Sequence, residues 1–131
     1  MRQVCPMDLN HQCPCGSEKS FKHCCHLLLS DRTLAQTPEQ LMRSRYTAYV
    51  IGDLPYIRKT WHRDYCPPDL SLEGLPEFIR LQIVSHSHSN NRGYVHFRAF
   101  YYTQDELTWM EEQSQFVKLS ECWLYTTGEV K

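Results

Sequence analysis

Two tight pairs of cysteines near the amino end constrain this chain more than any other feature of its sequence. Cys13 and Cys15 are separated by one residue, and after eight further residues Cys24 and Cys25 stand side by side. A pair of thiols at each end of a short excursion brings four soft ligands onto one tetrahedral ion. The spacing therefore predicts a structural zinc site with these four cysteines as ligands.

The residues between the two pairs support a compact metal site. Gly16 allows the backbone a left-handed conformation close to the metal. Ser17 is a candidate N-cap for a short helix over residues 18–24. Phe21 would then pack over the second pair of cysteines, three and four positions further on. Because adjacent helical side chains diverge by about 100°, we expect the helix to end at these two cysteines, so that both thiolates reach one ion.

Disulfides, or reduced cysteines without a role, are the alternatives to zinc. Disulfides are typical of small secreted chains, but residues 1–9 contain no hydrophobic signal segment. His26 is the best substitute ligand, whereas Cys5 and His11 find no free position in a filled four-thiol site. Three further side chains near the cluster offset the negative charge of four thiolates around one zinc ion: Lys19, Lys22 and His23.

The length and charge of the chain exclude several classes of protein. Its 131 residues suffice for one domain with a core plus a small appendage. With 14 basic and 15 acidic residues, the chain carries no strong signal for nucleic acid or membrane, and no apolar run approaches the roughly 20 residues that span a bilayer. Three cysteines outside the cluster, Cys5, Cys66 and Cys122, favour a reducing cytoplasm.

The pattern after the cysteines predicts two helices. Thr37 is an N-cap, Pro38 follows at the first helical position, and Gln40 completes a capping box. Gly52 ends this helix and Asp53 caps the next. One face of the first helix carries Met42, Arg45, Tyr46, Tyr49 and Val50, and one side of the second carries Leu54, Ile57 and Trp61.

From Phe78 the hydrophobic period changes to two, which predicts strands. Four are expected, over residues 78–84, 94–102, 107–118 and 122–126, with turns at 90–93 and 120–121 and an irregular connection over 64–77. Helices followed by an antiparallel meander form an α+β fold. We therefore predict a zinc knuckle over residues 1–29, a linker over 30–36 and an α+β domain over 37–131.

The cysteine segment resembles a known module. Cys13-x-Cys15-Gly16-Ser17, followed by Phe21-Lys22-His23-Cys24-Cys25, is similar to the SEC-C motif, the zinc-binding module in the tail of the SecA translocase motor and in many bacterial proteins. The resemblance implies that the same four cysteines bind the metal. The family usually has glycine at the position of Glu18.

The remainder resembles the uncharacterised bacterial YchJ family. The resemblance lies in Leu41 to Tyr46, Thr60-Trp61-His62, Gly93-Tyr94-Val95 and Trp123-x-Tyr125. It implies a SEC-C knuckle followed by an NTF2-like domain, in which helices close a curved antiparallel sheet into a cone with a pocket. Where the family tends to have Glu-Arg-Ser-Arg-Phe, this chain has Glu112-Gln113-Ser114-Gln115-Phe116 and lacks two charges.

A pocket in such a cone would be lined by residues from both helices and the third strand. His62 with Glu112 or Asp64 would form a general acid/base pair; alternatively, the aromatic residues are ordinary core and His62 caps a helix end. The predicted pocket residues are Tyr46, Tyr49, Trp61, His62, Glu112 and Ser114.

Five other side chains offer weaker chemistry. Arg43 and Arg45 can bind an anion, although pairing of one with Glu39 is the preferred interpretation. His86 and His88 can chelate a second metal, but the surrounding serines and asparagines favour solvated histidines at a loop tip. Cys66 has no adjacent base that would make it a nucleophile.

Three functions remain compatible with the sequence. The preferred one is a cytoplasmic bacterial zinc protein without catalytic activity, whose knuckle recognises a protein or ribosomal partner. The second is a binder of a small ligand in the cone, and the third is an enzyme that uses His62 and Glu112. A polar, roomy cone with His62 and Glu112 in contact would favour the enzyme, and a cone filled by aromatic side chains would leave the partner-binding protein.

Overall fold

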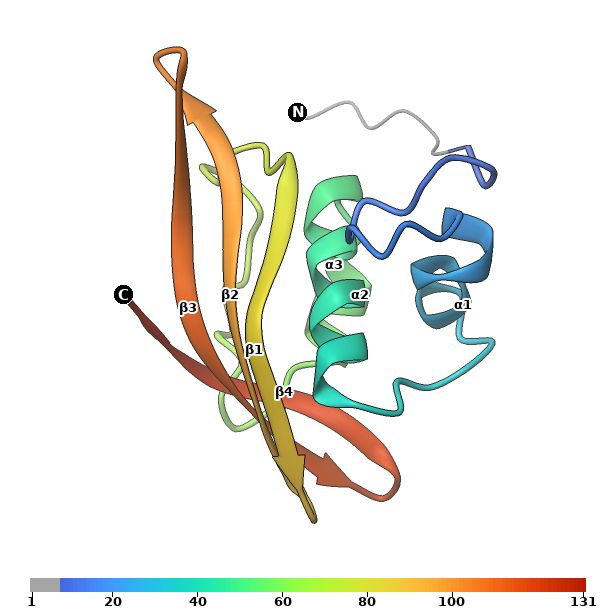
Figure 1. Cartoon of the computed structure of the whole chain (residues 1–131). Coiled ribbons are helices and arrows are strands. Elements are labelled where there is room, and N and C mark those ends of the chain that lie inside the picture. The colour runs from blue at the N-terminus through green and yellow to red at the C-terminus, as the bar shows by residue number, and fades with distance from the viewer. Residues whose placement is uncertain (1–7) are drawn as a thin grey trace.

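A four-stranded antiparallel sheet with helices on one face forms the body of the protein, as the computed structural model shows for residues 8–131 (Figure 1). The strands β1 (Arg80–Ser89), β2 (Arg92–Thr103), β3 (Glu106–Leu119) and β4 (Cys122–Val130) pair in chain order. Before them come the 3-10 turn η1 (Phe21–His23) and the helices α1 (Cys25–Leu29), α2 (Pro38–Ile51) and α3 (Leu54–Lys59). The predicted α+β class is confirmed.

The strand β2 matches its predicted pattern. Val95, Phe97 and Ala99 are buried on the face that meets the helices, while the residues between them face outward. Together with Leu81, Phe116 and residues of α2, they form the main core cluster. The alternation of period two therefore identified the inner face of the central strand.

The ends of the strands differ from the prediction. β1 begins only at Arg80, so Phe78 turns into the core while Ile79 remains 52% exposed. β1 then continues to Ser89, so His86 and His88 lie in the strand and not at a loop tip. The turn is confined to residues 90–91, where Asn90 has a positive φ of 55°. β4 extends beyond Thr126 to Val130, because it pairs with β3 along its whole length.

The start of α2 follows the predicted capping chemistry with one change of partner. The Thr37 side chain accepts a hydrogen bond from the Gln40 backbone N–H at 3.1 Å. The Gln40 side chain accepts from the N–H of Gln36 at 2.7 Å, and not from that of Thr37. Gly52 ends the helix in the left-handed conformation, and the Asp53 side chain caps α3.

The helix α2 lies between the sheet and the amino-terminal knuckle (Figure 1). On the sheet side its first turn approaches β2 very closely, since a Cβ at Gly93 would lie 2.2 Å from Pro38 Cγ. On the other side it contacts α1 and the loop that carries the cysteines. None of the helices within residues 8–131 is long and apolar enough to cross a membrane.

The knuckle forms less helix than expected. Ser17 does not cap a helix over 18–24; the chain turns at Glu18, bridges Ser20 to Gln12, and becomes helical only at Phe21. Glu18 has a positive φ of 72°, a conformation that cannot begin a right-handed helix. The first pair of cysteines therefore lies on a turn, and the second pair at a break between η1 and α1.

Two leucines of α1 dock the knuckle onto the body. Leu28 packs against the main core cluster, and Leu28 and Leu29 pack against the smaller cluster around Ala48, Tyr56 and Ile57. The connection from 64 to 77 is irregular, as expected.

The turn at Glu18 yields a prediction about stability. Glu18→Gly removes a side chain from a left-handed position, so we expect it to raise the free energy of unfolding by up to about 1 kcal/mol, after allowance for the freer unfolded chain. Urea denaturation of the metal-loaded protein measures this. Lys19→Gly is the matched control, because Lys19 is exposed and does not have a positive φ; it should lower stability. An equal loss in both variants would contradict the role of the turn.

Candidate metal centre and ligand cavity

The four predicted cysteine ligands converge in space. The Sγ atoms of Cys13, Cys15, Cys24 and Cys25 all lie within 4.8 Å of one another, and those of Cys15 and Cys24 are 3.6 Å apart. Four thiolates at about 2.3 Å from a tetrahedral ion are separated by about 3.8 Å. The cluster therefore has the dimensions of a four-thiolate metal site, and no disulfide joins any cysteine between residues 8 and 131.

Local backbone structure aims the four sulfurs at one point. The Cys13 N–H donates to Lys19 O at 2.8 Å and closes the loop that carries the first pair. Gly16 has a φ of 83° within this loop, as its position predicted. Cys24 has φ −132° and ψ −117°, which interrupts the helix between the adjacent cysteines and lets both face the same site. Phe21 packs against the cluster from one side, as expected.

Hydrogen bonds among the thiols shift the pKa values of the four cysteines in opposite directions. A hydrogen bond from Cys25 lowers the pKa of Cys24 to about 6, and hydrogen bonds from Cys13 and Cys25 hold the pKa of Cys15 far below its ordinary value. The hydrogen bond to Cys15 raises the pKa of Cys13 to about 11, and those to Cys13 and Cys15 raise the pKa of Cys25. The hydrogen bonds thus lower the pKa of two of the four thiols and raise the pKa of the other two.

The basic residue that contacts the cysteine loop comes from α2. Arg43 donates to Cys15 O at 2.6 Å and to Glu39 Oε2 at 3.0 Å, so the preferred pairing with Glu39 is confirmed. Although burial lowers it, the pKa of Arg43 is raised overall by Glu39 and by the charge of Cys15. The predicted Lys19, Lys22 and His23 are instead exposed.

The possible substitute ligands lie away from the four sulfurs. The His26 ring packs on Phe21, with centroids 5.3 Å apart, and His11 lies 4.0 Å from Asp8. Neither joins the group of four. Cys66 and Cys122 are free thiols elsewhere in the fold, and Cys5 falls outside the described residues.

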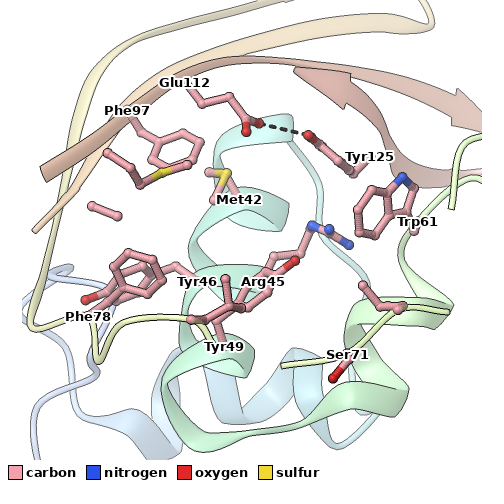
Figure 2. Close-up of a pocket in the computed structure, with 14 residues that line it drawn as sticks. Met42, Arg45, Tyr46, Tyr49, Trp61, Ser71, Phe78, Phe97, Glu112 and Tyr125 are labelled. Atoms are coloured by element: carbon pink, nitrogen blue, oxygen red, sulfur yellow. Dashed lines mark hydrogen bonds between the residues drawn. The ribbon is translucent and has the colours of Figure 1, made fainter. Parts of the chain in front are cut away.

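A second feature is a cavity of about 290 Å³ between the helices and the sheet (Figure 2). Its walls come from α2, β2, β3 and β4, and the irregular segment after α3 lines it with Leu70, Ser71 and Leu75. The wall is mainly apolar and aromatic. The remaining lining residues are Met42, Arg45, Tyr46, Tyr49, Trp61, Phe78, Phe97, Ala99, Met110, Glu112 and Tyr125.

Arg45 is a buried cation in this wall. It is 3% exposed, and its Nη1 donates to Ile57 O at 2.9 Å and to Thr60 Oγ1 at 2.7 Å. The guanidinium stacks 5.1 Å from the Trp61 ring and 4.6 Å from the Tyr125 ring. Burial lowers the pKa of Arg45. These contacts tie the end of α3 to the cavity wall.

Glu112 is the acidic group of the cavity. Ser114 Oγ donates to its Oε2 atom at 2.6 Å. Tyr125 Oη donates to the same atom at 2.8 Å (Figure 2). Burial, together with the nearby Glu112 carboxylate, raises the pKa of Tyr125, which keeps this phenol a donor. A Cβ at Gly128 would lie 2.1 Å from Oε2, so Glu112 in this conformation lies in the space that a side chain at position 128 would take.

The structure brings together four of the six predicted pocket residues. Tyr46, Tyr49, Trp61 and Glu112 line the cavity. Ser114 lies directly behind it, fully buried and bonded to Glu112. The sixth, His62, lies at a different cavity, beside Tyr65 and Arg92.

The proposed acid/base pair is therefore not assembled with Glu112. The ring nitrogen Nδ1 of His62 is 3.9 Å from the Asp64 carboxylate and accepts from the Asp64 N–H at 3.1 Å. The His62 backbone N–H donates to Tyr125 O at 2.8 Å. This bond fixes the His62 backbone beside β4, and the side chain lies outside the cavity that Glu112 lines.

The histidines of β1 bind protein groups. His86 Nε2 lies 3.0 Å from Glu39 Oε1, and the ring of His88 packs edge-on against Trp123. Within residues 8–131 the four cysteines form the sole cluster of three or more metal-ligating side chains.

Sequence analysis missed Tyr125 as a cavity residue. Tyr125 contacts Trp61, Phe116, Arg45 and Glu112. Its place in the Trp123-x-Tyr125 pattern was the available signal, since alternate strand residues share a face. The two glutamines that replace the family's arginines, Gln113 and Gln115, are exposed on either side of buried Ser114.

Comparison with known proteins identifies both parts of the chain. The model of the middle NTF2-like domain of YchJ matches residues 37–128, and the SEC-C motif model matches residues 10–27. A UPF0225 protein of Shewanella sp. (strain MR-4) is 40% identical, with 93% of this chain and 82% of the relative covered. A UPF0225 protein of Corynebacterium glutamicum is 35% identical, with 93% and 99% covered.

Two solved structures share the fold. A SEC-C motif containing protein from Rhodopseudomonas palustris, solved in solution, has a TM-score of 0.82 at 34% identity and covers 91% of this chain and 98% of its own. A crystal structure of a SEC-C motif containing protein from Psychrobacter arcticus has a TM-score of 0.77 at 26% identity, with 95% and 86% covered. By its domain match and its relatives, the chain belongs to the YchJ (UPF0225) family of proteins, with an amino-terminal SEC-C motif and an NTF2-like domain.

Proposed function

We propose that this protein binds one Zn²⁺ ion through Cys13, Cys15, Cys24 and Cys25, and that the ion holds the knuckle in its folded form. The convergence of four Sγ atoms within 4.8 Å carries the proposal. Soft thiolates in a tetrahedral arrangement select zinc or iron–sulfur centres over hard cations, and these spacings are not those usual for iron–sulfur clusters. A closed four-thiolate shell leaves no position for substrate, which is typical of structural zinc.

The zinc ion would substitute for a core that the knuckle lacks. Its own hydrophobic cluster contains one large side chain, Phe21, alongside the cysteines, with Leu29 at its edge. Structural zinc contributes about 10 kcal/mol or more to the folding of such small segments. The metal would therefore decide whether the loop beside Arg43 is ordered.

The metal site gives the first test of this proposal. Protein purified without added chelator should contain about one zinc per chain by elemental analysis, and Cys24→Ser should lose most of it, because one of four ligands is removed. Cys66→Ser is the matched control, since Cys66 is a free thiol outside the cluster, and it should retain the metal. Iron in place of zinc, or retention by Cys24→Ser, would refute the assignment.

We further propose that the knuckle contacts a partner, with the ribosome as the first candidate. The support is the resemblance to the SEC-C module together with the exposure of Lys19, Lys22 and His23, which project from the loop between the cysteine pairs. Exposed cations near an ordered loop suit the phosphate groups of ribosomal RNA.

This partner role predicts co-sedimentation of the zinc-loaded protein with ribosomes. Lys22→Glu should weaken this co-sedimentation at low salt and make it less dependent on salt concentration, because a phosphate contact that releases a counterion is lost. Lys131→Glu, the same charge change at the exposed far end of the chain, is the control. If the protein does not co-sediment with ribosomes but binds another protein in a way that depends on Lys22, the partner is a protein. If Lys22→Glu and Lys131→Glu reduce co-sedimentation equally, the knuckle has no specific role in it.

The cavity supports a second function, the binding of a small ligand. The distinguishing observation is that the aromatic residues do not fill the cone but leave about 290 Å³ beside Arg45 and Glu112. Small-molecule sites are typically apolar hollows of about this size and above, with a few fixed polar groups. The separation of His62 from Glu112 disfavours the proposed acid/base enzyme.

Binding of a neutral aromatic probe tests this second function. Addition of 2-phenylethanol should shift backbone amide resonances of β2 and β3 near Ala99 and Met110, since these residues line the cavity. Ala99→Leu should abolish the shifts, because its added carbons enter the cavity, while costing about 1–3 kcal/mol of stability. Shifts confined to the outer face of the sheet, or unchanged in Ala99→Leu, would argue against cavity binding.

A further inference from the structure

We propose that the cavity selects a small molecule with an apolar, preferably aromatic, body and a protonated amine, and that Glu112 binds the amine. This inference rests on the proposed ligand-binding function of the cavity and names the chemistry of its ligand. Three observations carry it: the fixed position of the carboxylate, its unpaired oxygen, and the aromatic wall around it.

The carboxylate of Glu112 is held in place from three directions. Ser114 and Tyr125 donate to the same oxygen, Oε2. Gly128 lies against the Glu112 side chain from Cγ to Oε2, where a Cβ would overlap all three atoms. Ser114 is itself fully buried. A side chain fixed by two charge-assisted hydrogen bonds and a matched hollow is organised before a ligand arrives.

The second oxygen of Glu112 is left for a ligand. Both hydrogen bonds of the carboxylate use Oε2, and among residues 8–131 Oε1 has neither a hydrogen bond nor an ion pair. Figure 2 shows the carboxylate at the edge of the cavity, on the side of Met42 and Phe97. A carboxylate oxygen beside apolar side chains is stabilised most by a hydrogen-bond donor that carries a positive charge.

Arg45 makes no hydrogen bond or ion pair with Glu112, although the opposite charges of the two groups attract each other. Its Nη1 is engaged by Ile57 O and Thr60 Oγ1, and its guanidinium plane faces Trp61 and Tyr125. The side chain is 3% exposed, so it forms part of the wall. Tyr125 separates the two charged groups, with its ring on Arg45 and its hydroxyl on Glu112.

The aromatic wall suits both parts of the proposed ligand. Tyr46, Phe78 and Phe97 line the cavity together with Tyr49 (Figure 2). Their ring faces attract a cation electrostatically, and their carbon surface buries an apolar body. A volume of about 290 Å³ admits one ring with a short side chain.

Three probes of matched shape test the inference on the full-length, zinc-loaded protein: 2-phenylethylamine, 2-phenylethanol and phenylacetate. In calorimetric titration, affinity should decrease from the amine to the alcohol to the acid. The amine should bind about tenfold more tightly than the alcohol, because one hydrogen bond between charged groups contributes about that much. Glu112→Gln should remove this preference and leave the affinity for the alcohol within about twofold, since only the charge changes. The comparison of probes on the unmodified protein stands even where this variant folds poorly.

Glu111→Gln is the matched control. Glu111 precedes Glu112 on β3 but points to the other face of the sheet, where it binds His96 and Arg98; its loss of charge should leave amine binding unchanged. Equal affinity for amine and alcohol, tighter binding of phenylacetate, or equal weakening by both glutamine variants would overturn the inference and leave the ligand-binding function intact. Failure of all three probes to bind would count against that function as well.

Discussion

The packing of α2 between two layers is the constraint on which the rest of the structure depends. One side of this helix meets the sheet, where Gly93 lets Pro38 approach β2. Another side meets the knuckle, where Arg43 binds the carbonyl of Cys15. A third carries Arg45 and the tyrosines that line the cavity. Because the 14 residues of this helix contact the core, the cysteine cluster and the cavity, these two candidate sites share one rigid support.

Features that depend on local chemistry could be predicted from the sequence. The capping residues at both ends of α2, the alternation along β2 and the convergence of the four cysteines all follow from short-range spacing, and the structure places them accordingly. The helix expected over residues 18–24 was wrong because a left-handed residue at Glu18 outweighed the capping signal of Ser17. Sequence spacing therefore identified which cysteines meet in space, but not the backbone conformation that brings them together.

Features that depend on long-range packing could not be predicted. Nothing in the local sequence shows that Gly128 leaves room for Glu112, since the two residues meet across β3 and β4. The pairing of His62 with Glu112 failed for the same reason, because the strand-like bridge between Trp61 and Tyr125 turns His62 outward. The cavity itself is the space left where facing side chains do not meet, and its size is a property of the assembled layers.

The three tryptophans happen to occupy three separate environments. Trp61 stands in the cavity wall with its indole N–H on Thr126 O, Trp123 is 4% exposed and donates to Gln36 O near the start of α2, and Trp109 is 48% exposed on the outer face of the sheet. Indole emission responds to the polarity and charge around each ring. The chain therefore carries intrinsic fluorophores that report on its interior, on the seam between helix and sheet, and on its solvent-facing surface, and each can be isolated by replacing the other two.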